Sequence, residues 1–65
     1  MKLNITAIKT KMAEMEYTGR KLAQMAGLSS TCVSSILHRG SCSIPSAGKI
    51  ARALGVELET IMKEE

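Results

Sequence analysis

Apolar side chains recur every three or four residues along most of this chain, and they never alternate with polar ones over the length of a strand. This period places the apolar residues on one face of a helix. Residues that favour helix starts precede these stretches, and glycines follow three of them. The pattern therefore predicts five short helices, and an all-α, compact bundle as the fold class.

The first, fourth and fifth helices are predicted from the two ends of the sequence. The first helix follows Asn4, and its apolar positions are Ile5, Ile8, Met12 and Met15. The fourth helix follows Ser43, carries Pro45 in its first turn, where the missing N–H is harmless, and stops at Gly55. The residues expected to line its buried side are Ile44, Ala47, Ile50, Ala51 and Leu54. A short fifth helix follows Val56, and its apolar residues are Leu58, Ile61 and Met62.

The segment from Tyr17 to Gly40 is the most informative part of the chain. Thr18 is expected to cap a helix over residues 19–26, Gly27 to end it in a left-handed conformation, and Ser29 to cap a third helix over residues 30–38. Two helices joined by so short a turn cross steeply, which is the helix-turn-helix geometry. That motif presents its second helix to the major groove of DNA.

The third predicted helix has two unlike flanks. At about 100° per residue, Val33, Ile36 and Leu37 share one side, which should face the core. The opposite side is small and polar, and consists of Thr31, Ser34, Ser35 and His38, with Ser30 and Cys32 at its borders. The hypothesis of DNA binding requires this hydroxyl-bearing flank to face solvent.

The composition restricts the size of the domain, the kind of core and the kinds of site that the chain can form. The 65 residues are expected to form one domain (1–65) with an aliphatic core, because there is one Tyr, no Phe and no Trp. Cys32 and Cys42 match no metal-binding or CxxC pattern, and His38 is the only histidine, so we expect two reduced thiols and no metal or cofactor. No leader or membrane-spanning stretch is apparent, which favours a cytoplasmic location.

The net charge of +3 is unevenly distributed. Residues 1–40 carry six basic and two acidic residues, a balance of +4, whereas residues 41–65 carry three basic and four acidic residues, a balance of −1. The basic part coincides with the predicted helix-turn-helix, as binding to a polyanion requires.

Two stretches carry a family resemblance, LAQMAGLSSTCVSSIL (22–37) and KIARALGVELETIM (49–62). Their order and separation resemble the lambda-repressor-like, Cro/CI (XRE) type helix-turn-helix regulators. The resemblance implies a sequence-specific, double-stranded DNA-binding transcriptional regulator, a small prokaryotic or phage-type repressor. Three features depart from the family pattern: Met12 and Leu37 replace an ion pair, Gly40 falls one residue late, and Lys21 stands where Glu is common.

The resemblance also assigns candidate DNA contacts. Base edges would be read by Ser30, Thr31 and Ser35, with Ser34 close by. Hydroxyl groups both donate and accept, so they discriminate bases modestly, and we expect DNA shape and dimer spacing to supply part of the specificity. Phosphates would be held at two places, the start of the second helix (Thr18, Gly19, Arg20 and Lys21) and the loop after the third (Arg39, Ser41 and Ser43).

The hypothesis of DNA binding also implies a partner, and it has to be weighed against other functions. Relatives bind two half-sites as homodimers, and the fifth helix with Val56 and Leu58 is the expected dimer surface. An alternative is a protein-interaction module of the same fold, an antitoxin-like or accessory component, with DNA binding secondary. An enzyme is rejected, because no positioned acid, base or nucleophile is evident, and no small-molecule ligand is indicated.

Overall fold

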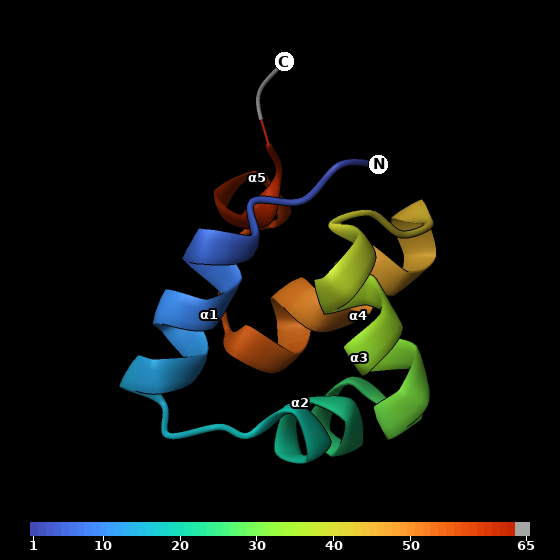
Figure 1. Ribbon diagram of the computed structural model, residues 1–65. Coiled ribbons are helices and arrows are strands. Elements are labelled where there is room, and N and C mark those ends of the chain that lie inside the picture. Colours follow the sequence, from blue (N-terminus) through green and yellow to red (C-terminus); the bar gives the residue numbers. More distant parts are fainter. Residues whose placement is uncertain (64–65) are drawn as a thin grey trace.

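The computed structural model describes residues 1–63, and over that range the chain is an all-α bundle of five helices (Figure 1). The helices are α1 (Ile5–Glu14), α2 (Gly19–Ala26), α3 (Ser30–Arg39), α4 (Ile44–Leu54) and α5 (Leu58–Ile61). The predicted fold class is confirmed, and α3 runs one residue beyond the predicted 30–38. α2 packs against both α3 and α4, and α4 also contacts α1 and α5.

The first four helices begin at the predicted capping residues. These are Asn4, Thr18, Ser29 and Ser43, and each side chain accepts a hydrogen bond from the backbone N–H three residues later, at 3.0 to 3.4 Å. Each cap satisfies a donor that the helix itself leaves without a partner. Local sequence therefore fixes where these helices start.

The end of α1 differs from the ends of α2, α3 and α4, which are followed by left-handed glycines. Here the left-handed residue is Glu16, with a φ of +58°. Its N–H donates to the carbonyl of Ala13 at 3.2 Å, and the N–H of Tyr17 donates to that of Met12 at 2.8 Å. These are the two bonds of a Schellman motif, a closure that glycine usually provides. The left-handed conformation is uncommon for a residue with a Cβ atom.

The core is aliphatic, as the composition predicted, and α4 passes through its middle (Figure 1). The largest fully buried side chains of the core are Ile8, Leu22, Val33, Ile50, Leu54 and Ile61. No polar or charged side chain among residues 1–63 is buried. The bundle is thus stabilised chiefly by the removal of aliphatic surface from water.

One predicted core position is wrong. Ile44 was expected on the buried side of α4, but its side chain is 65% exposed. The helical period does place it on the face of Ala47 and Ile50, both fully buried. Ile44 is, however, the first residue of α4, and no neighbouring element covers the helix at that point.

The N-terminal segment adds a feature that the pattern did not predict. It lies between the loop after α3 and the end of α5, with Leu3 buried. On one side the N–H of Leu3 donates to the carbonyl of Gly40 at 2.9 Å, and on the other the N–H of Asn4 donates to that of Ile61 at 2.8 Å. Three distant parts of the chain are joined in this way.

No helix within the described range is long and apolar enough to cross a membrane.

Candidate nucleic-acid interface

The turn between α2 and α3 consists of three residues that close one helix and open the next. Gly27 is left-handed, with a φ of +74°, and the N–H of Leu28 donates to the carbonyl of Ala23 at 2.9 Å. Ser29 then accepts from the N–H of Cys32 at 3.0 Å. Because both ends are fixed by local hydrogen bonds, the direction of α3 relative to α2 follows from the turn itself.

α3 has the two flanks that the sequence predicted. Val33 is 0% and Ile36 is 6% exposed, and Leu37 is partly buried against the core. On the opposite flank Thr31, Ser34, Ser35 and His38 are all exposed, as is Ser30. The helix is therefore anchored by its aliphatic residues and leaves its hydroxyl-bearing side free to approach a ligand.

The exposed flank of α3 is hollowed. A shallow, open depression is lined by Ser30, Thr31, Ser34, Ser35 and His38. All four candidate base-contacting residues therefore share one surface. His38 lines the same depression, as expected from its place on the exposed side of the helical period. Small side chains here allow the backbone of α3 to come close to a flat or convex partner.

The start of α2 supplies the first group of candidate phosphate contacts. Thr18 uses its hydroxyl oxygen to accept from the N–H of Lys21 at 3.1 Å, so this oxygen serves as a cap. Arg20 and Lys21 are exposed, and neither has an ion-pair partner among residues 1–63. The positive end of an eight-residue helix and two free cations thus coincide at one place.

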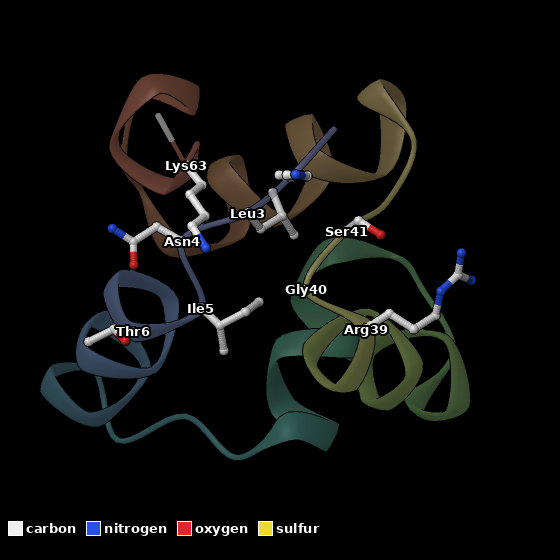
Figure 2. Close-up of a pocket in the computed structure, with 9 residues that line it drawn as sticks. Leu3, Asn4, Ile5, Thr6, Arg39, Gly40, Ser41 and Lys63 are labelled. Carbon is white, nitrogen blue, oxygen red and sulfur yellow. The ribbon is translucent and has the colours of Figure 1, made fainter. Parts of the chain in front are cut away.

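The loop after α3 carries the second group. Arg39, the last residue of α3, is exposed and its side chain extends into solvent (Figure 2), and Ser41 in the loop is half-buried. Ser43 is exposed, but its hydroxyl is engaged within the loop: it accepts from the N–H of Ser46 at 3.4 Å and donates to the hydroxyl oxygen of Ser46 at 3.0 Å. Any contact from Ser43 to a phosphate would fall to its backbone N–H.

The two cysteines have no disulfide between them and are half-buried. Burial raises the pKa of the Cys42 thiol, an effect that the nearby terminal ammonium opposes and Cys32 reinforces. A raised pKa keeps this thiol protonated at neutral pH and therefore weakly nucleophilic. Within residues 1–63 no group of His, Cys, Asp and Glu side chains has an arrangement that could hold a metal ion.

Comparison with known proteins gives one family match. The model of the Cro/C1-type HTH DNA-binding domain matches residues 7–65, which includes the whole α2–turn–α3 unit and the hollow on α3. No curated protein and no solved structure matches the chain significantly.

Proposed function

The chain belongs to the Cro/C1-type helix-turn-helix DNA-binding family, and from that membership we propose a sequence-specific regulator of transcription that inserts α3 into the major groove. The single observation that carries the proposal is the hollow on α3, which gathers the candidate base-reading hydroxyls on one exposed surface. In this proposal the chain is a small prokaryotic or phage-type repressor, which acts by occupying its operator.

Base reading falls to Ser30, Thr31, Ser34 and Ser35. Each hydroxyl donates or accepts at a base edge, and the methyl group of Thr31 packs against that of a thymine. These contacts discriminate less than a bidentate Arg–guanine pair, which is worth about 1–3 kcal/mol. Part of the specificity therefore comes from the shape and flexibility of the operator.

Phosphate contacts hold α3 in register. Thr18, Gly19, Arg20 and Lys21 contact one strand through backbone N–H groups and cations at the start of α2. Arg39, Ser41 and Ser43 contact the backbone on the other side of the groove. Arg20, Lys21 and Arg39 are exposed, and none of them forms an ion pair within residues 1–63, which supports these assignments.

A homodimer on DNA completes the proposal. Two half-sites centred about 34 Å apart place two copies of α3 on one face of the duplex. Val56 and Leu58 are only partly buried, and Met62 is 40% exposed, so the region around α5 offers apolar surface to a second copy.

Selection from random duplexes with the purified protein, repeated at two salt concentrations, tests the proposal. A regulator enriches a pseudo-palindrome, and its affinity falls steeply as salt rises, with a log–log slope of about −0.9 per phosphate contact. Failure to enrich any sequence, together with weak, salt-insensitive retention of DNA, would exclude the proposed function.

The alternative is a protein-interaction module, and exposed apolar side chains favour it as second candidate. Met25 is 51% and Ile44 is 65% exposed. An apolar protein contact through them responds little to salt, so the same pair of salt concentrations separates the two functions.

A further inference from the structure

A groove distinct from the hollow on α3 lies between the N-terminal segment, the start of α1 and the loop after α3 (Figure 2). It has a volume of about 560 Å³. We propose that this groove binds a further phosphate group of the DNA backbone, next to the one contacted by the loop after α3. The inference rests on the proposed function and extends the DNA contact to residues at both ends of the chain.

Backbone pairing brings the lining residues together. The N–H of Lys63 donates to the carbonyl of Lys2 at 3.1 Å, so the first and last described segments lie side by side. Lys2 also forms an antiparallel bridge with Ser41, next to the hydrogen bond from Leu3 to Gly40. Paired residues of this kind bring their side chains close together on one face.

The groove is basic. Its lining includes Lys2, Arg39 and Lys63, and no acidic residue among those described lines it. In Figure 2 the ammonium group of Lys63 points towards Asn4 at the start of α1, whereas the Arg39 side chain, on the opposite wall, extends outward, away from Lys63. A basic lining of this kind attracts an anionic group such as a phosphate.

The loop wall leaves the groove open. Gly40 has no side chain, and the space that a Cβ atom would fill there is bounded by Cγ1 of Ile5 at 3.7 Å. Beside it, the partly exposed Ser41 provides a hydroxyl at the rim. A tetrahedral anion at the rim therefore meets a hydroxyl donor and cations, over a floor that includes the apolar Ile5.

Continuity with the proposed DNA contact favours the DNA backbone over a free phosphate. Arg39 and Ser41 belong both to this groove and to the phosphate-contacting loop. Each strand of a duplex carries one negative charge about every 3.4 Å along the axis. A strand held at Arg39 therefore brings a neighbouring phosphate to the groove, where Lys63 meets it.

Phosphate ethylation interference on the selected operator tests the inference, with Lys63→Gln as the variant and Lys49→Gln as the control. Both lysines are exposed, and both variants lose one positive charge, but Lys49 lies on α4 and does not line the groove. Lys63→Gln should weaken operator binding by about fivefold at 0.1 M salt and reduce the salt slope by about 0.9. It should also abolish the interference from one or two phosphates that wild type shows.

An interference pattern shared by wild type and Lys63→Gln would overturn the inference while leaving the proposed function intact. Failure of the wild-type protein to bind any duplex would instead remove the proposed function and, with it, the DNA role of the groove. In that case an NMR titration with inorganic phosphate at constant ionic strength decides whether the groove binds phosphate at all. Shifts of the Leu3, Gly40 and Ser41 amides that Lys63→Gln abolishes support a site for free phosphate, and their absence overturns the phosphate site altogether.

Discussion

The α2–α3 unit and the N-terminal groove are both exposed and polar, but they are built in opposite ways. In the α2–α3 unit the hydrogen bonds that fix the helix starts and the turn join residues fewer than six apart, as at Thr18, Gly27 and Ser29. The groove instead joins residues near positions 2, 41 and 63. A surface of the first kind is encoded by a short stretch of sequence, whereas one of the second kind exists only in the folded chain.

The largest effect should come from the buried flank of α3, on which the whole α2–α3 unit depends. Val33→Asp places a carboxylate where the side chain is 0% exposed, with no partner available, and should cost more than about 4 kcal/mol and unfold the domain. Ser34→Asp introduces the same group on the exposed neighbour and should leave the fold intact. Circular dichroism during thermal unfolding compares them, and a folded Val33→Asp protein would contradict this orientation of α3.

Truncation in the N-terminal segment tests the long-range region. Leu3 is 2% exposed, and Leu3→Ala should lower the free energy of unfolding by about 2–4 kcal/mol. Ile44→Ala, which also removes an aliphatic side chain but from a position that is 65% exposed, should cost less than about 0.5 kcal/mol. Denaturant titration measures both. Equal losses would mean that the N-terminal segment adds nothing to the core.

This contrast also explains what the sequence could predict. The four polar caps and the glycines after α2, α3 and α4 act within a few residues, so the helix boundaries were predictable. The two flanks of α3 followed from the helical period. The burial of Leu3 and the exposure of Ile44 depend on which distant segment covers each residue, and no local pattern contains that information. The groove escaped prediction for the same reason, although the four candidate base-reading residues did come together on α3.

Loss of a phosphate contact proposed at α2 should have a smaller effect than loss of a core side chain. It should lower the affinity for every DNA sequence alike. Arg20→Ala removes one cation at the helix start and should reduce the salt slope by about 0.9, with a similar loss of affinity for operator and random DNA. Arg52→Ala removes an exposed arginine from α4, outside both proposed phosphate-contacting groups, and should change both quantities less. Fluorescence anisotropy over a range of salt concentrations gives the slopes, and equal slopes for the two variants would remove Arg20 from the interface.

The hydroxyls of α3 should act on specificity rather than on overall affinity. Thr31→Ala or Ser35→Ala should change the preference at one or two base pairs by about 1 kcal/mol and leave the salt slope unaltered, because no phosphate contact is lost. Selection from random duplexes measures the preference. An operator unchanged in both variants would assign base reading to other residues.

The smallest effect concerns the connection that leads into α2, and it separates local backbone strain from contacts made by the side chain. Glu16 and Gly27 close their helices with the same pair of hydrogen bonds, but Glu16 does so with a Cβ atom at a φ of +58°. A left-handed conformation costs a residue with Cβ about 1–2 kcal/mol, and the greater freedom of glycine in the unfolded chain offsets part of the gain. Glu16→Gly should therefore raise the free energy of unfolding by about 0.5 kcal/mol. Glu16→Ala removes the same carboxylate but keeps Cβ, so it should give no such gain. A denaturant titration measures the free energy of unfolding of both variants. Equal stabilisation by both would show that the charge of Glu16, and not its left-handed backbone, destabilises the fold.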